Sequence, residues 1–186
     1  MSKGTTSYRI NDENALYFLT CATVEWIDVF TKRKYKEIFT DSVNYCIENK
    51  GLVIRGWVLM TNHFHFIAHA EDGFALSEII RDMKKHTSKE VLKLLKAEPD
   101  GRSKWLLDEM KKAGTANSKK QIYQLWRNDN HPIHLFKAKT IEQKLNYIHF
   151  NPVEEGIVDY PEEYAYSSAR DYKDSIGLIK VESIYG

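Results

Sequence analysis

The sequence has little net charge, and it has no long apolar run. In 186 residues, 27 lysines and arginines nearly balance 26 aspartates and glutamates, giving a formal net charge of +1. This balance excludes a strongly basic field over the whole molecule, although a local basic patch remains compatible with it. No apolar run is long enough to cross a bilayer, and the first residues do not resemble a secretory leader. We therefore expect a cytoplasmic protein that makes no membrane contact.

Cysteine and proline are also scarce, with two and four residues respectively. Cys21 and Cys46 are isolated in apolar surroundings, which predicts free buried thiols in a reducing compartment, although a disulfide stays open. No repeat or low-complexity tract divides the chain. The length favours a single domain over residues 1–186. Within it we expect a helical insertion at 99–120 and a tail after residue 172.

Hydrophobic periodicity predicts an alternation of strands and helices. Strands are expected at 15–24, 52–60, 62–70 and 122–127, with a short edge strand at 131–136; helices are expected at 31–50, 76–96, 105–110 and 140–150. Thr31 and Thr140 are candidate N-caps, Gly51 is a helix stop, and Asn151-Pro152 should end the last helix. This order predicts an α+β fold, a ferredoxin-like split βαβ antiparallel sheet with helices on one face and an added C-terminal helix.

The segment His63-Phe64-His65-Phe66-Ile67 alternates polar and apolar residues at the period of a strand. His63 and His65 should therefore share one face, about 7 Å apart along the strand, while Phe64 and Phe66 face the core. Imidazole is a common ligand for transition metals. A His-x-His pair also arises by chance on half-buried strands, so the pair alone leaves metal binding open.

Two further patterns admit either a structural or a functional interpretation. The helix expected at 76–96 carries six basic residues against two acidic ones between 81 and 96, which suits a solvated face or a track for DNA phosphates. In the last helix, Tyr147 and Asn151 are four residues apart and share a face. A tyrosine hydroxyl is a possible nucleophile and an amide oxygen a possible metal ligand, but helix-end residues of these types usually only pack or cap.

Three motifs in order resemble those of the single-tyrosine HUH transposases. They are VLMTNHFHFI, then YIHFNPVEEGIV about eighty residues later, then YPEEYAYSSARDY. The chain is most similar to the REP-associated tyrosine transposase branch of the IS200-like family, from about residue 16 to residue 172. One departure is Thr61, where the family usually has proline; this changes the rigidity of the turn and leaves the ligand chemistry intact.

The resemblance implies a metal-dependent endonuclease and strand transferase that cuts single-stranded DNA near a hairpin through a 5′-phosphotyrosine. Tyr147 would be the nucleophile. His63 and His65 would hold Mg²⁺ or Mn²⁺ together with Asn151, where related enzymes use glutamine. His149 is expected to pack or to face DNA. The candidate DNA contacts are Arg81, Lys84, Lys85, Lys89 and Trp126, although core packing suits Trp126 at least as well. A homodimer is possible, because some relatives exchange the tyrosine helix between subunits.

Two other functions fit the same residues. One is a catalytically silent module that holds structured single strands without cutting them. The other is a metal-dependent hydrolase that combines His63 and His65 with His131 or His134, which would act without Tyr147. The second is the weaker alternative, because no carboxylate with ligand spacing accompanies the histidines.

Overall fold

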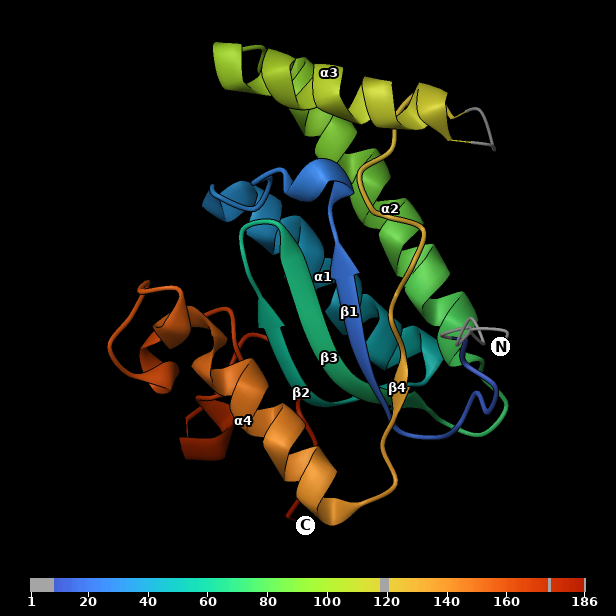
Figure 1. The fold of residues 1–186 in the computed structure, drawn as a ribbon, viewed down its shortest axis with the longest axis vertical. Helices are drawn as coiled ribbons and strands as arrows, with labels where there is room; N and C mark the ends of the chain where they lie inside the picture. The colour runs from blue at the N-terminus through green and yellow to red at the C-terminus, as the bar shows by residue number, and fades with distance from the viewer. Residues whose placement is uncertain (1–8, 118–120, 174, 186) are drawn as a thin grey trace, which may run out of the picture.

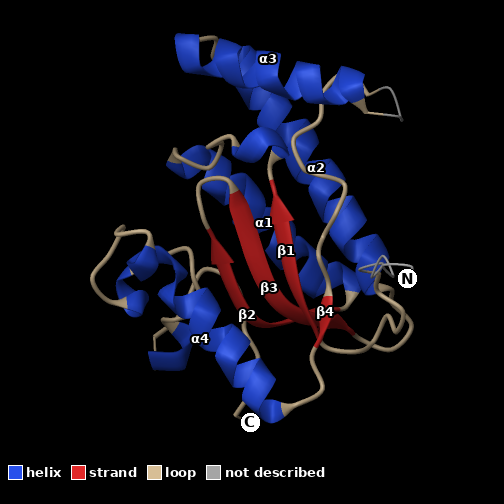
Figure 2. Cartoon of the chain, in the orientation of Figure 1, coloured by secondary structure: helices blue, strands red, loops and turns tan. Residues whose placement is uncertain are grey.

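The computed structural model describes residues 9–117, 121–173 and 175–185. Its centre is a four-stranded antiparallel sheet in the order β2-β3-β1-β4 (Figures 1 and 2). The strands are β1 (Tyr17–Ala22), β2 (Leu52–Leu59), β3 (His63–Ala70) and β4 (Ile133–His134). This order, with a helix after β1 and another after β3, is that of the ferredoxin-like fold and confirms the predicted fold class.

The helices lie on both faces of the sheet. Helices α1 (Arg33–Lys50) and α2 (Leu76–Ala97) pack on one face, and α4 (Ala138–Glu154) packs on the other. In Figure 1, α4 crosses in front of the sheet and α1 lies behind it. Helix α3 (Gly101–Ala116) sits beyond the end of α2, and short 3₁₀ helices occupy Val24–Trp26, Pro161–Glu163 and Asp171–Lys173.

Alternation along β3 divides the core into two layers. Phe64 and Phe66 point toward α1, where their rings lie 4.9 and 5.9 Å from the ring of Phe39. Ile67 points the other way and packs with Ile148 of α4. The histidines of β3 therefore face the same layer as α4, as strand geometry requires.

A bulge in β2 brings α4 close to the sheet. The pairing with β3 shifts between Ile54 and Gly56, so Arg55 has no partner in the register. A Cβ atom at Gly56 would come within 2.7 Å of Leu145 Cδ1. Gly56 therefore permits the close approach of α4, which carries Tyr147.

Several predicted boundaries were wrong. The segment 122–127 is not a strand, since only Trp126 forms a bridge, to Thr23, and β4 is the short segment predicted as an edge. Helix α4 continues two residues past Pro152, to Glu154, although Pro152 lacks the N–H of a helical hydrogen bond. Neither threonine is a cap: the N-caps of α1 and α4 are Lys32 and Lys137.

Other expectations hold. Gly51 ends α1 with φ of +64°, and Cys21 and Cys46 are free and buried. In the predicted insertion at 99–120, α3 is longer than the helix expected at 105–110, and residues 118–120 lie outside the described residues. Across the described ranges, no helix combines the length and apolarity that a bilayer span requires.

The docking of α4 provides a first prediction. Ile148 is fully buried between α4 and the sheet, so Ile148→Ala should lower the free energy of unfolding by about 2–5 kcal/mol, measured by urea denaturation. Phe150, two residues on and 49% exposed, is the matched control, and its replacement by alanine should cost less than about 0.5 kcal/mol. Equal losses for the two variants would contradict this packing.

Candidate active site between strand β3 and helix α4

His63 and His65 stand side by side on the face of β3 that α4 covers. Their ring centroids are 4.8 Å apart. His65 is only 4% exposed, and its ring stacks on Phe18 of β1 at 5.2 Å. The shared face expected from the alternating sequence is thus confirmed.

Hydrogen bonds orient both imidazoles. The Nδ1 atom of His65 lies 2.9 Å from the hydroxyl oxygen of Thr20, and Nδ1 of His63 lies 2.7 Å from Asn62 Oδ1. With Nδ1 engaged, each ring keeps Nε2 for another partner, which is the arrangement that metal-binding histidines commonly show. The turn before them is tied down by the Thr61 hydroxyl, which donates to Asp28 at 2.6 Å. Thr61 thus gains through a hydrogen bond some of the rigidity that a proline would supply.

Burial keeps both imidazoles neutral near pH 7. Desolvation, with the charges of His63 and Lys144 adding to it, lowers the pKa of His65 to about 3. Burial also lowers the pKa of His63, and the negative charge of Glu155 partly offsets this. Neutral imidazole is the form that binds a metal ion.

Helix α4 brings Tyr147 and Asn151 to the histidines. The ring centroid of Tyr147 lies 5.2 Å from that of His65, and the tyrosine side chain is 41% exposed. Asn151, one turn further along, is buried beside His63. All four side chains line one cavity of about 350 Å³ and come from a single chain. A second copy is therefore not needed to assemble the group, and a homodimer stays a prediction.

The cavity contains polar atoms that have no partner. Within the described ranges, His65 Nε2 and Asn151 Oδ1 are buried without a hydrogen bond. A buried polar atom without a partner costs free energy, and these two atoms are therefore available to a ligand in this cavity. No group of three His, Cys, Asp or Glu side chains in those ranges is arranged to hold a metal. A three-donor set therefore has to include the Asn151 amide, and two nitrogens with one oxygen suit a divalent ion such as Mn²⁺.

The comparison with known proteins identifies the family. The sequence profile described as "Transposase IS200 like" matches residues 11–149, well over half of the chain. The chain belongs to the IS200-like transposase family. No curated protein matches it significantly.

Two solved structures resemble this IS200-like transposase. One is a REP-associated tyrosine transposase bound to a REP hairpin, which matches 99% of this chain and 93% of its own, with 15% identity and a TM-score of 0.64. The other, from Deinococcus radiodurans R1 and assigned as a transposase, matches 80% of this chain and 95% of its own, with 18% identity and a TM-score of 0.43. At 15% identity the first likeness concerns the fold.

The cavity of this IS200-like transposase also includes residues that the sequence analysis missed. Lys144 lies one turn before Tyr147, with Nζ 4.4 Å from the Phe18 ring centroid and 5.6 Å from that of Tyr147. Glu155 lies one turn after Asn151. Both belong to the stripe that the tyrosine and the asparagine define, so helical spacing alone could have found them. Trp26, which also lines the cavity, gave no such signal.

The predicted DNA contacts are placed elsewhere. Trp126 is wrong as a stacking residue: it is 4% exposed, stacks on Phe30 at 5.3 Å and donates to the Thr87 hydroxyl. Lys84 is largely buried, where its ammonium group donates to the carbonyl of Arg127 and the side chain of Asn130.

The remaining three residues stay predictions as phosphate contacts. Arg81 is exposed and forms ion pairs with Glu78 and Asp82, while Lys85 and Lys89 are exposed. They lie away from the histidines, because α2 packs on the opposite face of the sheet.

The other histidines stand apart from the cavity. His131 pairs with Asp129 at 2.7 Å, and His134 stacks on Tyr17 at the sheet edge. Neither lines the cavity, which removes the ligand set of the alternative hydrolase. His149 packs, as one of its two expected roles required: its Nε2 lies 2.9 Å from the Ser168 hydroxyl on the side of α4 away from Tyr147.

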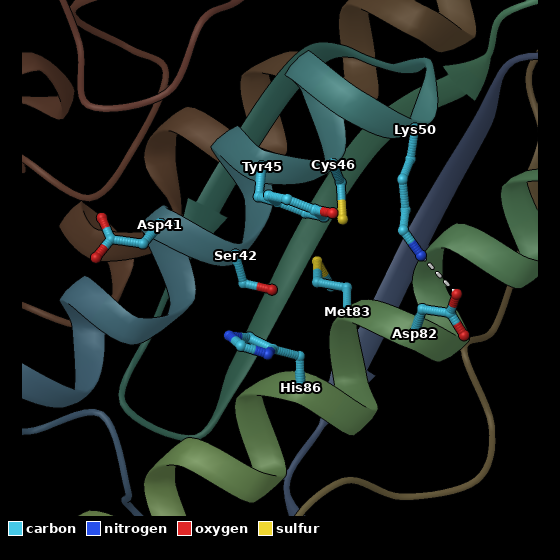
Figure 3. A pocket seen from close by; sticks show the side chains of 8 residues that line it. All are labelled: Asp41, Ser42, Tyr45, Cys46, Lys50, Asp82, Met83 and His86. Carbon is cyan, nitrogen blue, oxygen red and sulfur yellow. Dashed lines mark hydrogen bonds and ion pairs between the residues drawn. The ribbon is translucent and has the colours of Figure 1, made fainter.

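Another hollow is the groove between α1 and α2 (Figure 3). It has a volume of about 570 Å³ and carries Asp41 and the ion pair between Lys50 and Asp82. Its carboxylates disfavour a phosphate backbone, and it lies on the face of the sheet opposite to Tyr147. The groove therefore adds nothing to the candidate active site.

The buried His149 makes stability depend on pH. Burial lowers its pKa to about 4, whereas an unfolded histidine titrates near 6.5. Between these values the unfolded chain binds the extra proton, so unfolding free energy should fall as pH drops, by at most about 1.4 kcal/mol per pH unit from this residue. His149→Gln should flatten the curve measured by urea unfolding from pH 7 to 4. The exposed His86→Gln is the control, and equal slopes for both variants would contradict the prediction.

Proposed function

We propose that this IS200-like transposase cleaves and rejoins single-stranded DNA beside a hairpin, with Tyr147 as the nucleophile, as in the REP-associated branch. Its family makes it a DNA-processing protein. The observation that carries the finer proposal is the meeting of Tyr147, two neutral imidazoles and an unpartnered amide oxygen in one cavity. The fold of a hairpin-bound transposase supports the choice of a hairpin substrate.

His63, His65 and Asn151 would hold a divalent ion, Mg²⁺ or Mn²⁺. When bound, the ion would withdraw negative charge from the scissile phosphate and favour attack on phosphorus. Thr20 and Asn62 hold the imidazoles in the required orientation through Nδ1. Glu155 adds a carboxylate to the same cavity, and it makes no ion pair with another residue in the described part of the chain. The negative charge of this carboxylate would favour a cation in the cavity.

The reaction would be a direct displacement at phosphorus. The Tyr147 oxygen loses its proton and forms a bond to phosphorus, while the bond from phosphorus to the 3′ oxygen breaks and that oxygen gains a proton. The products are a 5′-phosphotyrosine and a free 3′-hydroxyl. Attack by a second 3′-hydroxyl reverses these steps and releases the tyrosine. No external energy source is required, because each phosphodiester bond is replaced by another.

Lys144 and Phe18 would prepare the nucleophile. The Lys144 ammonium group lies beside the Tyr147 ring, where its positive charge would attract the DNA phosphate. Phe18 supports the rings of both His65 and Tyr147, at 5.2 and 6.0 Å. The tyrosine ring is thus held from two sides while its exposed part remains open to the strand.

The central prediction concerns the covalent bond. Tyr147→Phe should abolish the covalent adduct formed with a labelled, hairpin-bearing single strand in Mn²⁺, because phenylalanine lacks the attacking oxygen. Affinity for the strand should change by less than about threefold, since one exposed hydroxyl contributes little to binding. Denaturing gels follow the adduct, and fluorescence anisotropy follows binding.

Tyr45→Phe provides the matched control. Tyr45 is 57% exposed on α1, on the other face of the sheet, and its loss of a hydroxyl should leave the adduct unchanged. An adduct that persists in Tyr147→Phe would remove this residue from its role. Strand binding without any adduct in the unchanged protein would favour the catalytically silent module instead.

A separate prediction concerns the ion itself. Glu155→Gln should weaken Mn²⁺ binding about tenfold, measured without DNA by titration calorimetry or by the electron paramagnetic resonance signal of free Mn²⁺. The neighbouring Glu154 has the same charge but lies outside the cavity, so Glu154→Gln should bind Mn²⁺ nearly as well as the unchanged protein. His63→Ala should lose most of the binding. Equal affinities for the two glutamine variants would exclude a contribution from Glu155.

A further inference from the structure

Trp26 is an exposed tryptophan at the mouth of the candidate active site. Its side chain is 49% exposed, whereas Trp57 and Trp126 are 0% and 4% exposed in the core. Its ring centroid lies 5.7 Å from that of His63, and the ring lines the same cavity as Tyr147. A large, exposed apolar ring beside the candidate active site is typical of a surface that binds a ligand.

The backbone that presents Trp26 is strained. Glu25 and Trp26 have φ of +49° and +54°, a left-handed conformation that residues other than glycine rarely adopt. Two such residues in succession cost about 1–3 kcal/mol each and persist only where the surroundings enforce them. Here the Asn62 amide donates to the Trp26 carbonyl at 3.2 Å, while the oxygen of the same side chain lies 2.7 Å from His63 Nδ1. The position of the tryptophan is therefore coupled to that of the histidine.

Trp26 also forms the wall of a second, larger cavity. This cavity has a volume of about 650 Å³ and lies between Val24–Trp26, the end of α3 and the segment 124–129. Trp26 is the residue that the linings of the two cavities share. The guanidinium carbon of Arg127 lies 6.0 Å from the centroid of the Trp26 ring. A strand that passes the tyrosine in this direction would cross the tryptophan.

The lining of this second cavity suits a base better than a phosphate. Its polar side chains include the exposed amide of Asn128, which can both donate and accept hydrogen bonds. The amide of Gln124 also lines it, and this amide already accepts from Asn117 and donates to the Trp126 carbonyl. It also carries the carboxylates of Glu25 and Asp129, and the one arginine already pairs with Asp129 at 3.3 Å. Carboxylates repel phosphate, while amides match the mixed donors and acceptors of base edges.

We propose that Trp26 is a stacking platform for an unpaired base next to the scissile phosphate, with the edge of that base in the amide-lined cavity. This inference rests on the proposed function, because it assumes that a single strand crosses the site. An aromatic ring can stack on any base, and such stacking is a large share of single-strand affinity. Trp26 would hold the flanking nucleotide and so fix the phosphate relative to Tyr147.

The test measures binding of a fluorescein-labelled, mixed-sequence single-stranded oligonucleotide of about twenty nucleotides by anisotropy, without divalent ions so that no cleavage occurs. Trp26→Ala should weaken binding about tenfold, and Trp26→Phe should retain most of it, because phenylalanine keeps a stacking face. Thermal melting followed by circular dichroism checks that each variant is folded.

Trp105→Ala is the matched control. Trp105 is 46% exposed on α3 and has the Arg102 guanidinium carbon 6.0 Å from its ring centroid, but it does not line either cavity. Its replacement should leave affinity unchanged. Equal affinities for the unchanged protein and Trp26→Ala would overturn the inference, as would equal losses for the two alanine variants.

A second measurement locates the base. Abasic positions are placed one at a time along the hairpin-bearing strand that Tyr147 cleaves. An abasic site at one position next to the cleaved bond should weaken binding to the unchanged protein about as much as the Trp26→Ala substitution does. The same abasic site should not weaken binding to the Trp26→Ala variant any further. Additive losses at every position would overturn the inference. If Trp26→Ala or the abasic sites gave a negative result while Tyr147 still cleaved the strand, the proposed function would stand and only the role of Trp26 would fall. If the unchanged protein neither bound nor cleaved the strand, the proposed function and the role of Trp26 would both fall.

Discussion

The contact of α4 with the outer face of the sheet is the interaction on which the site depends. Leu145 and Ile148 bury their side chains against Val58, Ile67 and Phe18. The same helix turns Tyr147 and Asn151 toward β3, because residues three and four apart share a face. The apolar contacts that stabilise the domain therefore also set the distance between the phenol and the imidazoles. Packing of α4 on the sheet is therefore enough to bring these side chains together.

Strand β3 contributes to the candidate site because its side chains alternate between the two layers of the core. On β3, Phe64 and Phe66 are fully buried in the core beneath α1, which holds the strand in one register. A slip by one residue would bury the imidazoles with α1 and expose the rings. The register that satisfies the core thus leaves His63 and His65 in the cavity. Thr20 and Asn62, from neighbouring segments, then fix the ring orientation.

Sequence reasoning reached the parts of the site that local geometry determines. The alternation around His65 and the spacing from Tyr147 to Asn151 place side chains on faces without reference to the rest of the chain. The chemical roles came from the family resemblance. Trp126 was misassigned because its burial depends on Phe30 and Thr87, which are distant in sequence.

Trp26 escaped prediction for a related reason. Two consecutive left-handed residues have no signature in composition or period, and here the conformation follows from the tie to Asn62. For α2, the sequence predicted the basic face of the helix but not where that face lies in the molecule. Charge counts along a helix reveal that a face is basic, but the sheet decides which side of the molecule that face occupies. These predictions therefore failed where the structure depends on long-range packing rather than on local propensity.

The unbroken course of α4 past Pro152 has a mechanical consequence. The Tyr147 hydroxyl and the Asn151 amide project from one continuous helix, separated by four residues or about 6 Å of axial rise. A movement of the α4 backbone that carried Tyr147 away from the imidazoles would therefore also carry Asn151 away. In the proposed reaction, an exchange of strands would therefore move the DNA ends while the backbone of α4 stays in place.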